Sequence, residues 1–89
     1  MQKRIYARVS GWVQGVGFRY FVKSTASLHS LTGWVHNRED GEVELEVQGP
    51  PAEVDAFLEA VREGNRWSQV EGVETRRLDP IRENGFEVL

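Results

Sequence analysis

Three glycines and an arginine are the residues of this sequence whose types and spacing first indicate chemistry. Gly11, Gly15 and Gly17 fall within seven residues, and Arg19 follows two positions after the last glycine. Glycine adopts left-handed turns without strain, and its missing side chain lets an anion approach the backbone closely. A guanidinium group can hold two oxygens of one phosphate and stays charged at any working pH. The stretch is therefore a candidate anion-binding cradle with a fixed positive charge at its rim.

The elements on either side decide whether such a cradle can form. Residues 4–10 alternate between apolar and polar side chains, which predicts a strand with one buried face. From Phe18 to His29 the apolar period is helical. The glycines thus precede a helix N-terminus, where N–H groups lack partners and carry the positive end of the helix dipole. The spacing alone is also compatible with an ordinary glycine-rich turn followed by a solvated arginine. The stretch matches neither the phosphate-binding loop that ends in Gly-Lys-Ser/Thr nor the dinucleotide-binding fingerprint.

The remaining periodicities predict an α+β domain. Asp40-Gly41 is a typical hairpin signal, and prolines 50 and 51 are typical of a helix start. The further elements expected are a strand at 31–37, a strand at 43–48, a helix from Pro51 to a glycine cap at Gly64, a strand at 69–78 and a short strand at 86–88. The order β-α-β-β-α-β predicts a ferredoxin-like two-layer sandwich: an antiparallel sheet, two helices on one face and a short C-terminal strand.

Length and composition exclude several classes of protein. The chain has 89 residues, enough for one domain, which we expect to span residues 1–89. Its 11 Lys and Arg residues against 14 Asp and Glu residues give a net charge of −3, which argues against a nucleic-acid partner. It has no cysteine, and no apolar run typical of a signal peptide or a membrane span. We therefore expect a cytoplasmic protein, and a monomer because its exposed faces are charged.

Two motifs carry a resemblance to a known family. The run Val13-Gln14-Gly15-Val16-Gly17-Phe18-Arg19, followed by Gly33-Trp34-Val35-His36-Asn37 and Asp40-Gly41, resembles acylphosphatases. The similarity extends over nearly the whole chain, including the acidic strand at 43–48 and the Gly-Pro-Pro start of the second helix. It implies hydrolysis of the carboxyl-phosphate bond of acyl phosphates, with no metal and no cofactor. The implied partners are a small acyl phosphate as substrate and inorganic phosphate as product and inhibitor.

The resemblance also implies roles for individual residues. Arg19 matches the family's essential arginine, and Asn37 matches the asparagine that holds the attacking water. The phosphoryl group would be bound by the backbone N–H groups of Gln14, Gly15, Val16, Gly17, Phe18 and Arg19. No side chain stands out as the general base, and we expect a phosphate oxygen of the substrate to accept the proton. The alternative function is a ferredoxin-like module that binds phosphate, another anion or an effector without turnover.

Other polar and aromatic residues are interpreted as structural. His29 is expected at the surface near the end of the first helix, and His36 on the strand face opposite to Asn37. Lys23 either adds positive potential to the site or is simply solvated. The tryptophans are expected to pack and the alternating glutamates to form a solvated face: Trp12, Trp34 and Trp67, and Glu42, Glu44 and Glu46. Two segments, 28–31 and 64–67, depart from the family's common pattern.

Overall fold

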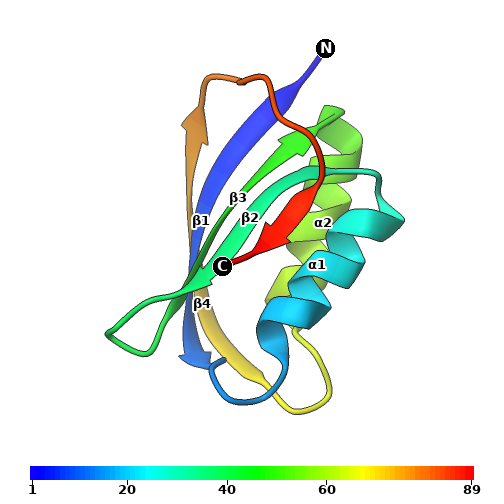
Figure 1. Cartoon of the computed structure of the whole chain (residues 1–89). Helices are drawn as coiled ribbons and strands as arrows, with labels where there is room; N and C mark the ends of the chain where they lie inside the picture. Colours follow the sequence, from blue (N-terminus) through cyan, green and yellow to red (C-terminus); the bar gives the residue numbers. More distant parts are fainter.

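A five-stranded sheet with two helices on one face forms the fold (Figure 1). The computed structural model describes residues 1–89. Its elements are β1 (Lys3–Trp12), α1 (Phe18–Leu28), β2 (Thr32–Asn37), β3 (Val43–Gly49), α2 (Pro51–Glu63), β4 (Gln69–Leu78) and β5 (Phe86–Val88). The predicted order of elements is confirmed, and with it the ferredoxin-like sandwich.

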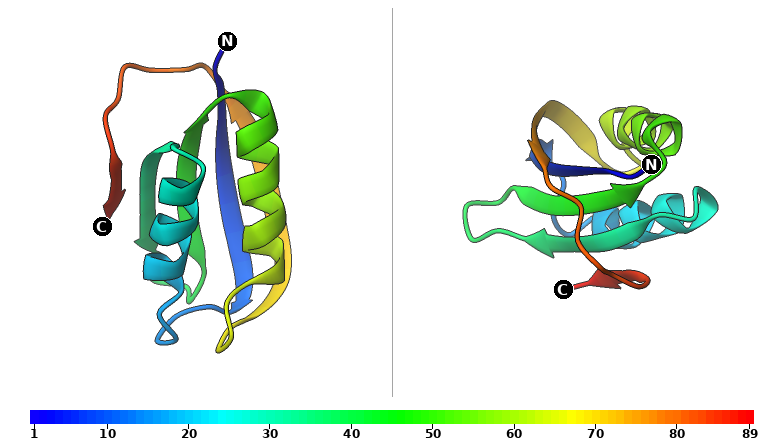
Figure 2. Two further views of the ribbon diagram at one scale, coloured as in Figure 1. Left: turned by 90° about the vertical axis from the view of Figure 1, so that its right-hand side faces the viewer. Right: turned by 90° about the horizontal axis from the view of Figure 1, so that it is seen from above.

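The strands lie in the order β4-β1-β3-β2-β5. β1 pairs antiparallel with β3 and β4, and β2 pairs antiparallel with β3. The expectation of a wholly antiparallel sheet is wrong at one edge, because β5 pairs with β2 in parallel. The cause is topological: β4 ends at the end of the sheet where β2 begins. Residues 79–85 cross over that end, so that β5 then runs beside β2 in the same direction (Figure 2).

The core lies between the helices and the inner face of the sheet. The apolar side chains of α2 are buried as their spacing predicts, namely Val54, Phe57, Leu58 and Val61. The buried side chains of α1 are Phe18, Val22, Thr25 and Ala26. Leu28, in contrast, is 84% exposed. It is the last residue of α1 and lies at the margin of the stripe, where the helix no longer faces the sheet.

The outer face of the sheet carries acidic side chains, but they are paired with arginines. The pairs are Glu42 with Arg8, Glu44 with Arg38 and Glu46 with Arg4. The three glutamates share the outer face, as expected, but they are half-buried and paired instead of fully solvated. Each of these glutamates is compensated by a cation from β1 or from the turn after β2, because the side chains of adjacent strands stand next to one another on one face.

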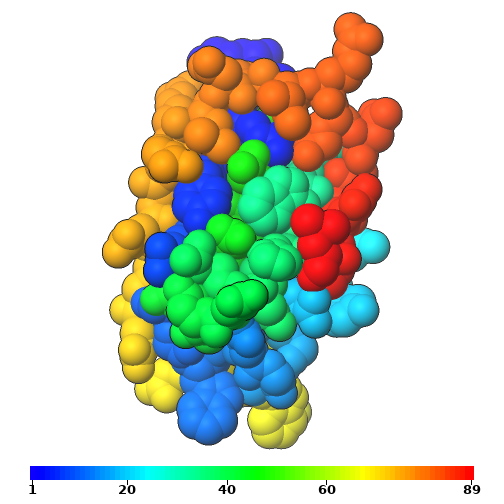
Figure 3. All heavy atoms as spheres, turned by 60° about the vertical axis from the view of Figure 1, so that its left-hand side comes forward, coloured from blue at the N-terminus to red at the C-terminus, as the bar shows by residue number.

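Arg4 is the most deeply buried of these cations, with 1% of the residue exposed. Its guanidinium contacts both Glu46 and Glu83 at 2.8 Å. Burial disfavours its charge, but the hydrogen bonds to the two glutamates outweigh this and raise its pKa. Gln48 accepts from Arg4 and donates to the carbonyl oxygen of Ile81 at 2.7 Å. The network thus fastens the 79–85 crossover, which lies across the upper end of the molecule in Figure 3, to the sheet.

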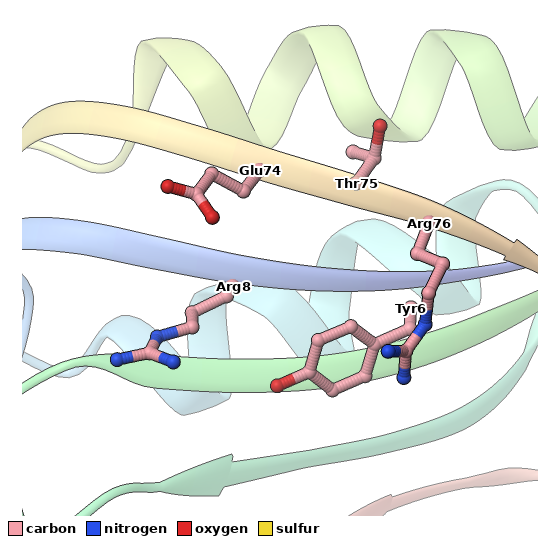
Figure 4. A pocket seen from close by; sticks show the side chains of 5 residues that line it. All are labelled: Tyr6, Arg8, Glu74, Thr75 and Arg76. Atoms are coloured by element: carbon pink, nitrogen blue, oxygen red, sulfur yellow. The ribbon is translucent and has the colours of Figure 1, made fainter.

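A shallow hollow lies elsewhere on the outer face (Figure 4). It is lined by Tyr6 and Arg8 of β1 and by Glu74, Thr75 and Arg76 of β4. The guanidinium of Arg76 lies 5.0 Å from the centre of the Tyr6 ring. None of the predicted site residues lines this hollow, so it is no part of the candidate site.

Candidate active site

The loop between β1 and α1 is shaped by two of the three glycines. Gly15 and Gly17 have φ angles of 75° and 73°, in the left-handed region that glycine adopts most readily. A Cβ atom at either position would meet no heavy atom within 4 Å, so the backbone conformation and not crowding requires glycine. Gly11 has a different role: it lies at a bulge between β1 and β4, where a Cβ atom would be 2.2 Å from the carbonyl oxygen of Gln69.

The backbone N–H groups of this loop are free to bind a ligand. None of those from Gln14 to Tyr20 donates to another backbone group. The first bond of the helix runs from the N–H of Phe21 to the carbonyl oxygen of Gly17, at 3.1 Å. The first turn of α1 contains no acidic side chain that could occupy the donors. A run of free donors at the positive end of a helix is a typical anion site.

A cavity of about 190 Å³ opens at this loop. It is lined by Val13, Gly15, Gly17, Phe18, Arg19, Tyr20 and Asn37. Asn37 is the last residue of β2, whereas Arg19 is the second residue of α1. The fold therefore brings these two polar side chains to one cavity, beside the free N–H groups.

The side chain of Asn37 has an unsatisfied acceptor. Its Oδ1 atom is buried and has no hydrogen-bond partner in the protein. Such an atom costs about 1–3 kcal/mol unless a partner is found. Asn37 lines the cavity, and its amide group offers N–H donors as well as this acceptor.

Arg19 is held by the residue that follows β5. Its Nη1 donates to the backbone oxygen of Leu89 at 2.6 Å, and the N–H of Leu89 donates to the carbonyl oxygen of Val35 at 2.8 Å. The β5–β2 pairing thus continues to the residue that contacts the guanidinium. Arg19 forms no salt bridge with a carboxylate side chain, so its other donors remain for a ligand.

Gln14 differs from its neighbours in the loop because its side chain forms hydrogen bonds with another segment. Its Nε2 donates to the carbonyl oxygens of Arg38 and Glu42, at 2.7 and 2.9 Å. The side chain therefore ties the loop to the β2–β3 turn. Val16 packs against the core, and Phe18 belongs to it. Phe18 lines the cavity, whereas Gln14 and Val16 do not.

The β2–β3 turn that receives Gln14 is stabilised by charge. The Asp40 carboxylate accepts from the N–H of Glu42 at 3.1 Å, and from Arg38 and Arg8 at 3.0 Å each. The backbone bond from Glu42, followed by the arginine contacts, holds the pKa of Asp40 below its ordinary value. A fixed turn keeps the two carbonyl oxygens that accept from Gln14 in place.

The histidines and Lys23 lie outside the cavity. His29 follows the last residue of α1 and contacts Glu53 at 2.8 Å, which matches the expected surface position. His36 contacts Glu44 at 3.0 Å on the outer face of the sheet, as expected from its parity. Lys23 is exposed and does not line the cavity. No group of three or more histidine or carboxylate side chains is placed to hold a metal ion.

The expectation that the tryptophans pack is wrong for two of them. Trp12 is 69% exposed and Trp67 is 67% exposed, whereas Trp34 is half-buried. Trp12 is the last residue of β1, beyond the bulge, and Trp67 lies in the loop after α2. The guanidinium of Arg66 lies 5.0 Å from the centre of the Trp67 ring.

Sequence reasoning missed a residue that contacts the loop. The Nδ2 of Asn65, after α2, donates to the carbonyl oxygen of Val16 at 2.9 Å. The only available signal was the departure of segment 64–67 from the family's common pattern. That departure pointed to loop conformation and not to a specific contact.

Comparison with known proteins connects this geometry to a family. The family model for acylphosphatases matches residues 5–88. The chain belongs to the acylphosphatase family. The acylphosphatase of Moorella thermoacetica is 46% identical over 96% of this chain and 91% of its own length. The crystal structure of the Bacillus subtilis acylphosphatase has a TM-score of 0.94 and 38% identity, covering 100% of this chain and 99% of that one.

A similar unit also occurs within a larger protein. The structure of full-length HypF, in its phosphate- and nucleotide-bound form, has a TM-score of 0.93 and 27% identity. The match covers 100% of this chain but 12% of HypF. The acylphosphatases of Moorella thermoacetica and Clostridium acetobutylicum, in contrast, match over 91% and 99% of their own lengths. The activity of this chain is therefore that of an acylphosphatase: hydrolysis of the carboxyl-phosphate bond of an acyl phosphate, with inorganic phosphate as a product.

Proposed function

We propose that the β1–α1 loop binds the phosphoryl group of the substrate and that Arg19 and Asn37 complete the catalytic site. The backbone N–H groups of residues 14–19 donate to the phosphoryl oxygens. Arg19 contributes charge-assisted donors to the same oxygens. Asn37 holds the attacking water, which its amide can do because it offers both an acceptor and donors.

The reaction demands little more than these groups. The leaving group is a carboxylate of low pKa, so no strong acid is needed to expel it. In a loose, metaphosphate-like transition state the attacking water needs little activation. The enzyme's task is then to hold charged oxygens and to place the water in line, and a phosphate oxygen of the substrate accepts the proton of that water. We propose that the reaction requires no metal and no cofactor.

The observation that carries the assignment is that Asn37, whose buried Oδ1 has no partner in the protein, lines the same cavity as Arg19. A buried polar atom without a partner is uncommon in a folded protein and points to a ligand or a water. A module that only bound phosphate would need the free N–H groups and the arginine, but not an additional buried acceptor beside them. The non-catalytic alternative is also not favoured by relatives that are themselves acylphosphatases.

The test is hydrolysis of benzoyl phosphate in the presence of EDTA, with p-nitrophenyl phosphate as the comparison substrate. We expect EDTA-resistant turnover of benzoyl phosphate only. Arg19→Ala should lose at least 10²–10³-fold in rate, since removal of one oxyanion donor typically costs that much and arginine offers two. Arg66→Ala is the matched control, because Arg66 contacts Trp67 and does not line the cavity.

Asn37→Ala separates water placement from phosphate binding. We expect kcat to fall much more than affinity for inorganic phosphate, measured as its inhibition constant. Equal losses in both would mean that Asn37 binds phosphate or supports the loop. Near-normal turnover in Arg19→Ala, or turnover abolished by EDTA, would refute the assignment of the site.

We further propose that residues 1–89 act as one cytoplasmic, monomeric domain without a nucleic-acid partner. No helix is long and apolar enough to cross a membrane. The pairing of Arg4, Arg8 and Arg38 with carboxylates leaves these cations unsuited to a phosphate backbone. Light scattering after size exclusion should give the mass of a single chain, and a dimer would overturn the monomer.

A further inference from the structure

We propose that Asn65 is a positioning residue that fixes the direction of one phosphate-binding N–H group. The proposal rests on the proposed function, in which backbone donors of the β1–α1 loop bind the phosphoryl group. The Nδ2 of Asn65 donates to the carbonyl oxygen of Val16 at 2.9 Å, across 49 residues of sequence. The β1–α1 loop and the α2–β4 loop lie side by side at the lower end of the molecule in Figures 1 and 3.

A hydrogen bond that fixes the direction of the Val16 carbonyl group also fixes the direction of the Gly17 N–H group. The two groups belong to one peptide unit, which is planar and trans, so they point in opposite directions. Because the carbonyl oxygen points towards Asn65, the N–H points away from it. Gly17 lines the cavity, and its N–H donates to no other backbone group. The direction that Asn65 imposes therefore leaves this donor available to a ligand.

The peptide unit needs such a restraint because Gly17, on one side of it, resists rotation only weakly. Gly15 and Gly17 flank Val16, and glycine has mirror-image conformations of similar energy. A flip of the Val16–Gly17 peptide requires compensating changes in the ψ of Val16 and the φ of Gly17 only. The flipped unit would present a carbonyl oxygen to the phosphoryl group in place of a donor. A flip would also break the hydrogen bond from Asn65, which opposes it.

Asn65 is itself anchored. Its N–H donates to the Oγ of Ser68 at 2.9 Å, and that hydroxyl donates to the carbonyl oxygen of Asn65 at 3.1 Å. Its own Oδ1 is buried without a partner. An unpaired buried oxygen lowers stability, so loop stability alone accounts poorly for an asparagine here. The contact of its Nδ2 with Val16 accounts for it.

The test compares Asn65→Ala and Asn65→Leu with a matched control. Both variants remove the donor, and leucine keeps the number and branching of the side-chain heavy atoms. Gln48→Ala is the control, since Gln48 also donates a side-chain amide to a backbone carbonyl, that of Ile81, but outside the cavity. Melting temperature, kcat/KM for benzoyl phosphate and the inhibition constant of inorganic phosphate are measured for each protein.

We expect the Asn65 variants to lose about ten-fold in kcat/KM and in phosphate affinity, less than the 10²–10³ typical of a donor removed outright. Gln48→Ala should lose stability but stay within about two-fold of wild type in both constants, because distant sites act independently. Folded Asn65 variants with normal constants would overturn the proposal. So would equal losses in Gln48→Ala, which would mean that the constants follow stability alone.

A measurement on the wild-type protein covers the case in which the variants do not fold. By NMR, the amide proton of Gly17 should shift strongly when inorganic phosphate is added. A silent Gly17 amide beside a responsive Phe18 amide would overturn the role of Asn65 and leave the proposed function intact. Wild-type protein that neither binds phosphate nor hydrolyses benzoyl phosphate would refute the proposed function, and this proposal with it.

Discussion

Replacing Gly17 with alanine separates the chemistry of the loop from its folding. Gly17 has a φ of 73°, and an added Cβ atom would meet no heavy atom within 4 Å. The cost is thus that of the backbone alone, about 1–2 kcal/mol for a left-handed residue. The reduced freedom of the unfolded chain returns about 0.4–1 kcal/mol. The net loss of about 1 kcal/mol corresponds to a fall of about 4–8 °C in melting temperature for a domain of this size.

The same methyl group should affect catalysis far more. Gly17 lines the cavity, so the methyl group would tilt or screen a donor to the phosphoryl group. A hydrogen bond to a charged group is worth about 1.5–3 kcal/mol, which corresponds to about ten- to a hundred-fold in kcat/KM. The assay is benzoyl phosphate hydrolysis at a temperature well below the melting point of every variant.

Gly85→Ala is the matched control for this prediction. Gly85 has the same φ of 73° and equally open surroundings, but it precedes β5 and does not line the cavity. The two variants should lose the same stability, and only Gly17→Ala should lose activity. Gly33→Ala should not fold, because its Cβ atom would lie 1.9 Å from the carbonyl oxygen of Glu46 on the neighbouring strand. Full activity in Gly17→Ala, or an equal loss of activity in Gly85→Ala, would refute the proposed phosphate-binding role of the β1–α1 loop.

Two further predictions concern charges outside the cavity. Glu83→Gln should lower the free energy of unfolding by about 1.5–3 kcal/mol, because Arg4 is buried and would keep only Glu46 as an ionic partner. Urea unfolding measures this loss. The kcat of the variant should equal that of the wild type. The lowered pKa of Asp40 means that its carboxylate stabilises the fold above about pH 4, and that this contribution disappears as pH falls through the folded-state pKa. The melting temperature of the wild type should therefore fall more steeply between neutral and acidic pH than that of Asp40→Asn. Identical profiles would mean that the contacts of Asp40 with Arg38 and with the N–H of Glu42 do not contribute to stability.

Local patterns predicted most of the fold because each element has a strong periodic signal. The apolar stripe of α2 and the alternation in β3 are examples, and the bounds of β4 were predicted without error. The direction of β5 was not predictable from its three residues. It depends on which end of the sheet the 79–85 crossover passes, and the crossover is held there by Arg4 and Gln48 from other strands.

In the candidate site, too, local features could be predicted from the sequence and long-range contacts could not. The conformations of Gly15 and Gly17 follow from their residue type and from the strand-to-helix change around them. The restraints on the loop do not, because each comes from a distant segment. Gln14 reaches the β2–β3 turn, and Val16 accepts from Asn65. Glutamine and asparagine occur in many loops, so neither residue type indicates its partner.

An acidic protein can bind an anion where the fold places its carboxylate side chains away from the binding site. The chain has a net charge of −3, and the carboxylates of the outer face are matched by arginines that therefore cannot serve a ligand. No acidic residue lines the cavity beside α1, and no carboxylate side chain pairs with Arg19. The anion site is thus made by the absence of acidic side chains and by free backbone donors, and not by an accumulation of basic residues. A backbone donor cannot be neutralised by titration, but its direction can be lost. The long-range side-chain contacts of Gln14 and Asn65 are accordingly where we expect substitutions to alter catalysis without removing a donor to the substrate.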